Sequence, residues 1–307
     1  MFYTDGKLQY PVRVDSPNPL FARMLQQAIG GVEGEIRVCL QYMFQAWGAR
    51  GPKKYRDLLL NTATEEIGHI EMLATAVALN LEGASPAIQE GMATKNPMLQ
   101  AMLGGMSARS YLSAGMAAMP TNSEGVPFDA SHVYASGNLA GDMYANVAAE
   151  ATGRTLAVRL RKLTDDPGMK DMLSFLIARD AMHQQQWLAV IEELGGNAAL
   201  PIPDSFPAEE ENQDYAHTFL TFATEDGPPP PEGRWSNGPS LDGRGEFRSE
   251  PAVPVGEEPL LSAPTPEAFA QAAQMQDGAP AKSPQLGSKL PEQNGGGVIE
   301  KVKDAIS

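Results

Sequence analysis

Two stretches of the chain carry the same pattern of acids and histidines inside segments that otherwise read as buried helices. Each stretch has an acid, then a second acid in the following helical segment, then a histidine three residues later. The sets are Glu35, Glu66 and His69, with steps of 31 and 3, and Glu150, Asp180 and His183, with steps of 30 and 3. Each acid interrupts a stripe of apolar residues spaced three or four apart, so it faces neighbouring helices. Burying an unpaired carboxylate costs several kcal/mol, so the fold must supply a compensating charge.

Four long segments have the apolar periodicity of helices. They are residues 18–47, residues 52–81, the segment from Ser136 to the turn TDDPG, and the segment from that turn to Gly195–Gly196. The short turns at 48–52 and 164–168 make the first two helices one antiparallel hairpin and the last two another. A long crossover, residues 83–135, joins the hairpins. This organisation predicts an all-α, ferritin-like four-helix bundle with an extended C-terminal tail.

The spacing predicts that the polar groups of both hairpins meet. They lie about 16 residues on either side of each turn, which is roughly 24 Å along each helix. Antiparallel partners therefore bring them to the same height in the bundle, around one central point. We expect two divalent cations there, because cations offset the charge of the carboxylates. Carboxylate-bridged dinuclear proteins hold their ions in this way.

The acid-x-x-His pattern alone is a weak signal, because all four histidines of this chain follow an acid by three residues. His132 and His217 lie in connecting segments that are rich in proline or acids, without a matching hairpin. We predict that these two histidines are structural or exposed.

The apolar stripes also assign individual side chains to the core or to the surface. Val32 lies on the stripe of the first helix, and Trp47 and Trp187 are expected to be buried as well. Glu65 points off the stripe of the second helix. We therefore expect Glu65 to be solvated or to contact the crossover.

Composition and charge narrow the class of protein. The chain has 307 residues and a formal charge of −15, with 38 acids against 23 bases, which argues against binding to nucleic acid or anionic membranes. There is no apolar run long enough to span a membrane, and no secretory signal pattern at the N-terminus. The single cysteine, Cys39, excludes an internal disulfide framework and favours a reducing compartment. We therefore expect a cytoplasmic protein.

The character of the sequence changes after Leu200. Segments such as GPPPPEGR and EPAVPVGEEPLLSAPTP are rich in proline, glycine and acids, and they are unsuited to regular structure. Scattered aromatic residues favour packing of this tail against other subunits; they are Phe219, Phe222, Trp235, Phe247 and Phe269. We divide the chain into a bundle, residues 1–200, and a tail, residues 201–307, of which 201–250 is expected to be ordered.

Five segments resemble the manganese catalase family, in the same order and over about residues 1–250. They are GGVEGEIRVCLQYMFQAWG, TATEEIGHIEM, SGNLAGDMYANVAAEATGR, ARDAMHQQQW and GRWSNGPSLDG. The resemblance implies a non-haem catalase that disproportionates hydrogen peroxide at a carboxylate-bridged pair of manganese ions. It implies manganese ligands at Glu35, Glu66, His69, Glu150 and His183, with Glu66 bridging the two ions.

The resemblance also implies roles for residues around the metal pair. Tyr42 matches an outer tyrosine of the family, and Arg154 matches an arginine seen in some members. Asp180 stands where some members have a longer glutamate, and Ala149 stands where some have an arginine. The predicted catalytic residues are Glu35, Glu66, Tyr42, Arg154 and Asp180.

Some members of the family bind calcium, and the matching positions here are Asp57, Asn61, Ser236 and Gly238. Asn61 and Arg234 depart from the family pattern. Asp57 and Asn61 are equally consistent with ordinary surface residues of the second helix. The family also implies a homohexamer in which the tail wraps over neighbouring subunits.

Two other functions are compatible with the same ligand types. A di-iron protein of this fold would be an oxidase or a peroxidase, and ligand types alone do not separate iron from manganese. A metal-storage protein would need a closed cage with an acidic entry path, whereas the long tail indicates a smaller oligomer. Elemental analysis would discriminate the first alternative, and the mass in solution the second.

Overall fold

The computed structural model describes residues 6–82, 109, 113–196, 208–222, 229, 231–253, 256 and 267. The chain separates into two compact units, Met1–Ala252 and Val253–Ser307, and all the elements below belong to the first. The predicted division at residue 200 stays a prediction. The part of the predicted crossover from 83 to 108 lies outside the described residues, as does Phe269.

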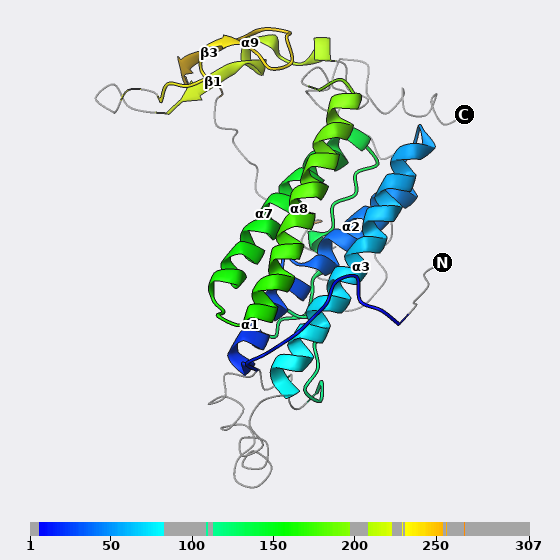
Figure 1. Cartoon of the computed structure of the whole chain (residues 1–307). Helices are drawn as coiled ribbons and strands as arrows, with labels where there is room; N and C mark the ends of the chain where they lie inside the picture. The colour runs from blue at the N-terminus through cyan, green and yellow to red at the C-terminus, as the bar shows by residue number, and fades with distance from the viewer. Residues whose placement is uncertain are drawn as a thin grey trace. The chain divides into compact units, whose positions relative to one another are not determined.

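Five helices of the described residues build a bundle (Figure 1). They are α1 (Pro19–Gly30), α2 (Glu35–Gly48), α3 (Lys53–Glu82), α7 (Leu139–Lys162) and α8 (Pro167–Glu193). α2 packs against α3 and α7 against α8, each across a short turn, and further contacts of α2 with α7 and of α3 with α8 join these hairpins. α1 packs against α3. The predicted all-α, ferritin-like bundle is confirmed.

Capping residues account for where the helices begin. Asn18 caps α1 and Asp166 caps α8, and each is followed by a proline that suits the first turn of a helix. The second carboxylate oxygen of Asp166 accepts the backbone N–H groups of Asp15 and Ser16, both at 2.7 Å. This cap therefore also ties the N-terminal segment to the start of α8.

The prediction of one long helix over residues 18–47 is wrong, because the structure has two helices there, α1 and α2. α1 ends at Gly30 and α2 begins at Glu35, since Gly31 and Gly34 between them adopt extended backbone with ψ of 171° and 166°. Glycine inside a helix costs about 1 kcal/mol relative to alanine, which favours a break here. Val32 lies in the break and is 38% exposed, so its predicted place in the core is also wrong. The break puts Glu35 in the first turn of α2, where the helix dipole favours a carboxylate.

Gly30 has no room for a side chain. A Cβ atom at this position would lie 2.5 to 2.6 Å from backbone atoms of Thr121. Gly30→Ala is therefore expected to destabilise the fold by about 1–3 kcal/mol through overpacking. Gly48→Ala is the matched control, because Gly48 also ends a helix and has nothing within 4 Å of its Cβ position. Urea unfolding of both variants checks the prediction, and equal midpoints would contradict it.

The core consists of two hydrophobic clusters with a polar layer between them. In α3 the first cluster contains Met72 and the second contains Ala63. In α8 the first cluster contains Leu176 and the second contains Trp187. The residues between these positions on both helices include the predicted metal ligands. The candidate site therefore lies in the middle of the bundle, closed at either side by packed apolar side chains.

The two tryptophans of the bundle differ from each other in burial. Trp187 is fully buried, as predicted, whereas Trp47 is 55% exposed, so its predicted place in the core is wrong. Trp47 follows the buried Ala46, and one residue rotates the side chain by about 100° around the helix. On the outside of α2 its ring meets the exposed ring of Phe44 edge to face, with centroids 5.2 Å apart.

The described part of the tail contains a small sheet, which the sequence reading did not predict. β1 (Thr218–Thr221) pairs in parallel with β3 (Glu246–Pro251), and β2 (Gly238–Pro239) pairs antiparallel with the other edge of β3. The short helices η3 (Ala208–Glu210) and α9 (Gln213–Ala216) precede β1, and η1 (Ala130–His132) lies in the crossover. Of the segments described as unsuited to regular structure, only the start of EPAVPVGEEPLLSAPTP, Glu250 and Pro251, takes part in a strand. β3 reads EFRSEP, and its longer pairing is with β1, which lies far away in the chain, so local propensity does not reveal it.

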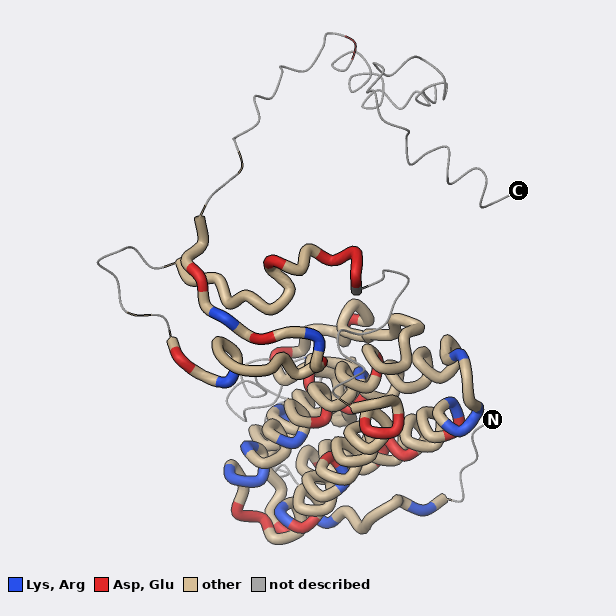
Figure 2. Tube along the Cα trace, turned by 90° about the horizontal axis from the view of Figure 1, so that it is seen from above, with Lys and Arg blue, Asp and Glu red and all other residues tan. Residues whose placement is uncertain are grey.

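Acidic and basic residues are mixed along the outside of the bundle (Figure 2). Within the described residues, no helix combines the length and apolar character needed to cross a bilayer. Even the 30-residue α3 carries three glutamates, Glu65, Glu66 and Glu71, in its middle.

Candidate metal centre

Four helices bring five acidic and imidazole side chains to one point between the two hydrophobic clusters. These residues are Glu35 from α2, Glu66 and His69 from α3, Glu150 from α7 and His183 from α8. They form two triads, Glu35–Glu66–His69 and Glu66–Glu150–His183, in each of which the ligand atoms lie within 4.8 Å of one another. The structure thus brings together all five residues that the sequence analysis singled out as ligands. Both triads contain Glu66.

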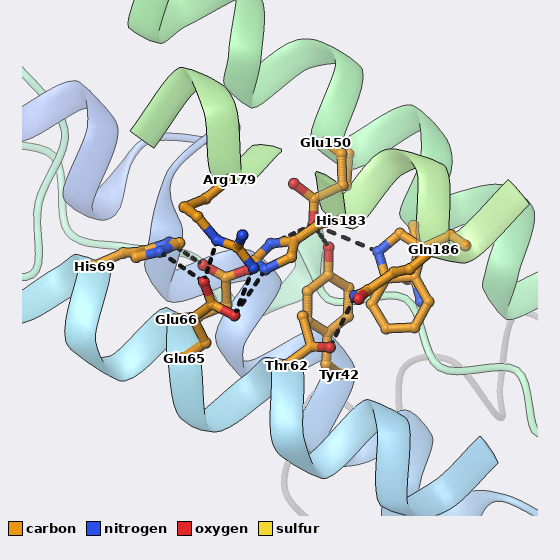
Figure 3. A network of polar contacts seen from close by, with 12 residues as sticks. Tyr42, Thr62, Glu65, Glu66, His69, Glu150, Arg179, His183 and Gln186 are labelled. Atoms are coloured by element: carbon orange, nitrogen blue, oxygen red, sulfur yellow. Dashed lines mark hydrogen bonds and ion pairs between the residues drawn. The ribbon is translucent and has the colours of Figure 1, made fainter. Parts of the chain in front are cut away.

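Glu66 lies between the two histidine rings (Figure 3). Its Oε2 is 2.6 Å from Nδ1 of His69, and its Oε1 is 2.8 Å from Nδ1 of His183. The ring centroids are 5.8 Å apart with an interplanar angle of 23°. The remaining acids lie farther out, with Glu35 Oε2 3.7 Å from His69 Nδ1 and Glu150 Oε1 3.6 Å from His183 Nδ1. Each half of the site therefore has its own acid and its own imidazole.

These close contacts lack the angles of hydrogen bonds. Among the described residues, the buried side-chain atoms without a hydrogen-bond partner are Arg37 Nε, both carboxylate oxygens of Glu66, and both ring nitrogens of His69 and of His183. Buried polar atoms are normally satisfied, so such a concentration requires an explanation. Carboxylate oxygens and imidazole nitrogens are donors that manganese and iron accept. The residues present therefore suit a pair of such cations.

The buried carboxylates of the site repel one another, so added positive charge would stabilise them. Burial, together with the negative charge of Glu66, raises the pKa of Glu35 and of Glu150. Burial opposes protonation of the two histidines, yet the surrounding carboxylates raise the pKa of both. The histidines in turn lower the pKa of Glu66, although burial opposes this shift. Protons therefore compensate part of the acidic charge, a role that bound cations perform as well.

Two aromatic residues support Glu150 from the second hydrophobic cluster. The hydroxyl of the fully buried Tyr42 donates a hydrogen bond to Glu150 Oε1. The indole Nε1 of Trp187 donates to the same oxygen at 3.5 Å. The two rings pack together with centroids 4.9 Å apart. Tyr42, predicted to stand outside the ligands, therefore touches one of them directly.

Comparison with known proteins decides the family. The family model of manganese containing catalases matches residues 1–284. This chain belongs to the manganese catalase family. The match spans the whole bundle and includes all five residues of the two triads, which agrees with the resemblance carried by the sequence motifs.

Individual manganese catalases support this assignment. The manganese catalase of Bacillus subtilis strain 168 is 44% identical over 266 residues, which cover 87% of this chain and 96% of that protein. The manganese catalase of Lactiplantibacillus plantarum is 37% identical over 227 residues, covering 74% and 84%. The crystal structure of KatB, a manganese catalase from Anabaena, matches with a TM-score of 0.64 and 25% identity over 81% of this chain and 99% of that one.

Two other predicted catalytic residues of this manganese catalase family member lie on α7 and α8. Asp180 is buried at 5% exposure, and burial raises its pKa, with the charge of Glu35 adding to the shift. Arg154 lies on the exposed side of α7. The arginine that the structure places beside the histidines is Arg179, which the sequence analysis did not single out.

The prediction for Glu65 is wrong. The sequence analysis expected this side chain to be solvated or to contact the crossover. Its side chain is only 17% exposed and contacts both histidines and Arg179. The apolar stripe missed Glu65 because the residue lies on the flank of α3, beside α8. One signal was available, since Glu65 and Arg179 each precede a ligand histidine, His69 and His183, by four residues.

Two of the four predicted calcium positions, Asp57 and Ser236, have other partners in the structure. Asp57 is exposed and pairs with Lys53 at 2.6 Å. Asn61 is also exposed on α3. Ser236 Oγ donates to the carbonyl of Gly233 at 3.0 Å, and Gly238 begins β2 with φ of +85°.

The two remaining histidines are placed as predicted. His132 is exposed in the crossover. His217 is mostly buried in the tail, where its Nε2 lies 3.3 Å from Asp242 Oδ2. His132 is therefore exposed and His217 structural.

Proposed function

We propose that this chain binds two manganese ions in its two triads and disproportionates hydrogen peroxide to water and dioxygen. The observation that carries this proposal is the sharing of one buried glutamate, Glu66, by two triads whose ligand atoms are largely unpartnered. Glu35 and His69 would hold one ion, Glu150 and His183 the other, and Glu66 both. The relatives named manganese catalases support both the metal and the reaction.

The reaction converts two molecules of hydrogen peroxide into two of water and one of dioxygen. When bound, the two manganese ions supply the two-electron oxidation and reduction that this requires, with one electron from each ion. The protein has to hold the ions at a fixed separation and to exclude other reactants. A site between two packed hydrophobic clusters performs both tasks.

Glu35 is the ligand best placed to handle the protons of peroxide. Its side chain is 14% exposed, whereas those of the other four ligands, Glu66, His69, Glu150 and His183, are at most 3% exposed. Substrate can therefore reach Glu35 from solvent more easily than the other ligands. Burial and the charge of Glu66 raise its pKa, so its carboxylate takes up a proton more readily than an ordinary glutamate.

Asp180 and Tyr42 act around these ligands. Asp180 is close enough to Glu35 for the charge of one carboxylate to raise the pKa of the other. We assign to Asp180 the exchange of protons with Glu35. The Tyr42 hydroxyl orients Glu150 by donating to its Oε1. A part for Arg154 is supported by the family resemblance alone.

Metal content and oxygen release test the function together. His69→Ala is expected to lower manganese below two ions per subunit and to reduce oxygen release by at least about a hundredfold, because even outer partners of metal ligands contribute that much. His132→Ala is the matched control, since His132 also follows an acid by three residues but is exposed. Parent protein that contains manganese but releases no oxygen from peroxide would refute the proposal. Iron instead of manganese in protein from its native host would favour the di-iron alternative.

The assembly and its location are part of the same proposal. Exposed aromatic side chains, among them Phe44, Trp47, Phe222 and Trp235, support a homohexamer with its tails laid over neighbouring subunits. Calcium at the predicted tail and α3 positions is supported only by the family resemblance. The single buried cysteine, Cys39, supports a reducing compartment, the cytoplasm.

A further inference from the structure

Glu65, the residue directly before Glu66, lies on the outer side of both histidine rings (Figure 3). Its Oε2 is 3.1 Å from Nε2 of His183, and its Oε1 is 3.6 Å from Nε2 of His69. The Nδ1 atoms of the same rings face Glu66 at 2.8 and 2.6 Å. Two consecutive glutamates therefore bracket both rings, Glu66 on the inner side and Glu65 on the outer side.

Glu65 is itself held from two other elements. Arg179 of α8 donates from Nε to Oε1 at 2.6 Å and from Nη2 to Oε2 at 3.3 Å. Gln9 of the N-terminal segment donates from Nε2 to Oε1 at 3.1 Å. A two-pronged contact with a guanidinium fixes the plane of a carboxylate as well as its position. The two oxygens of Glu65 are therefore held in the orientation in which each faces one ring.

We propose that Glu65 and Arg179 are positioning residues for the metal pair: Glu65 faces the Nε2 atoms of both rings, close to but not yet within hydrogen-bond geometry, and accepts their N–H groups once the Nδ1 atoms bind metal. This inference rests on the proposed function. A neutral imidazole has one N–H and one lone pair, so an N–H on Nε2 leaves the lone pair on Nδ1. That lone pair faces Glu66 and the centre of the site. One carboxylate thus selects the tautomer of both imidazole ligands.

An ordinary ion pair between helices would not have this geometry. Each oxygen of Glu65 faces a ring nitrogen in addition to a nitrogen of Arg179. The positive charge of Arg179 also offsets that of Glu65, so the pair orients the rings without adding net negative charge to an acidic site. Because the glutamate and the arginine each lie four residues before a ligand histidine, the pair faces both rings from one side.

Glu65→Gln tests the role of the shared carboxylate. The amide keeps the size of the side chain but has only one accepting oxygen, so at least one ring loses its acceptor. We expect manganese affinity, measured on the full chain by competition with a chelator, to fall by about 10- to 100-fold. Glu71→Gln is the matched control, because Glu71 is an exposed glutamate of the same helix. Its affinity is expected to equal that of the parent.

Substitutions of Arg179 separate positioning from a merely structural role. Arg179→Lys retains a charge but loses the two-pronged contact, so its manganese affinity should lie between those of the parent and Arg179→Met. In electron paramagnetic resonance, the signal of the magnetically coupled manganese pair should be strongest in the parent, weaker in Arg179→Lys and weakest in Arg179→Met. Circular dichroism of each metal-free variant reports whether the bundle remains folded.

Three results would overturn the inference. They are parent affinity in Glu65→Gln, equal loss in Arg179→Lys and Arg179→Met, and affinity loss only in variants that no longer fold. In these cases the parent would still bind two manganese ions and release oxygen, so the proposed function would stand. A parent that binds no manganese would refute both proposals together.

Discussion

Glu66→Gln is expected to abolish oxygen release from hydrogen peroxide and to leave at most one firmly bound manganese ion per subunit. Glu66 belongs to both triads, and its two oxygens face the Nδ1 atoms of His69 and His183 at 2.6 and 2.8 Å. The amide keeps the shape but removes the charge and one of the two ligand oxygens. Removing one partner of a buried charge interaction costs about 3–5 kcal/mol. A loss of about 4 kcal/mol lowers a binding constant by roughly a thousandfold.

This prediction is checked by counting manganese per subunit and by measuring oxygen release from the same preparation. Glu71→Gln provides the control, because it makes the same chemical change at an exposed position of α3. Glu35→Gln provides a graded comparison, because Glu35 belongs to one triad only. This variant should retain more bound manganese per subunit than Glu66→Gln. If Glu66→Gln kept two ions and the parent rate, Glu66 would not be the ligand that joins the two halves.

Removal of manganese by a chelator is expected to lower the melting temperature by about 8–16 °C. A ligand present at a thousand times its Kd stabilises the fold by about 4.1 kcal/mol. In a domain of this size each kcal/mol corresponds to about 2–4 °C. The physical reason is that metal removal leaves the oxygens of Glu66 and the Nδ1 atoms of His69 and His183 buried without hydrogen bonds.

Thermal melts followed by circular dichroism check this prediction, first with chelator and then after manganese is added back. The Glu66→Gln variant is the control, because its melting temperature should respond much less to either treatment. An identical melting temperature of the parent with and without metal would count against a metal centre inside the bundle.

The stabilisation by manganese is expected to weaken as the pH falls from 8 to 6. Burial lowers the pKa of His183, but its contacts with Glu65 and Glu66 outweigh burial and raise the pKa from 6.5 to about 10. A raised pKa stabilises the metal-free fold fully below pH 6.5, and this contribution is lost as the pH rises through about 10. Manganese must displace that proton, so its apparent affinity falls about tenfold per pH unit for each proton displaced. The difference in melting temperature should therefore be smallest at pH 6, and a constant difference would contradict this.

The repeated acid and acid-x-x-His pattern was sufficient to predict the bundle and its central cluster. A helix places residues three or four positions apart on one face, and an antiparallel hairpin brings residues equally distant from its turn to the same height. Both rules depend only on counting along the chain. For that reason Glu35, Glu66 and His69 could be assigned to one half of the site without any tertiary information.

The same counting does not specify which flanks of neighbouring helices meet. Glu65 lies one position away from the apolar stripe, one helical turn before His69, and only the packing of α3 against α8 puts it beside Arg179 and His183 as well. Trp47 likewise lies one position beyond a buried residue and faces outward. A rotation of about 100° per residue makes such positions sensitive to how the helices pack.

The sequence by itself determined the helical segments, their pairing and the five side chains at the centre, because each follows from local periodicity and from distances along the chain; periodicity alone missed the break at Gly31 and Gly34, which local helix preference favours. Only the tertiary structure decided the contacts of Glu65 with Arg179 and His183 and the sheet that pairs β1 with β3. These features depend on contacts between residues far apart in the sequence, whose energies local preferences do not contain.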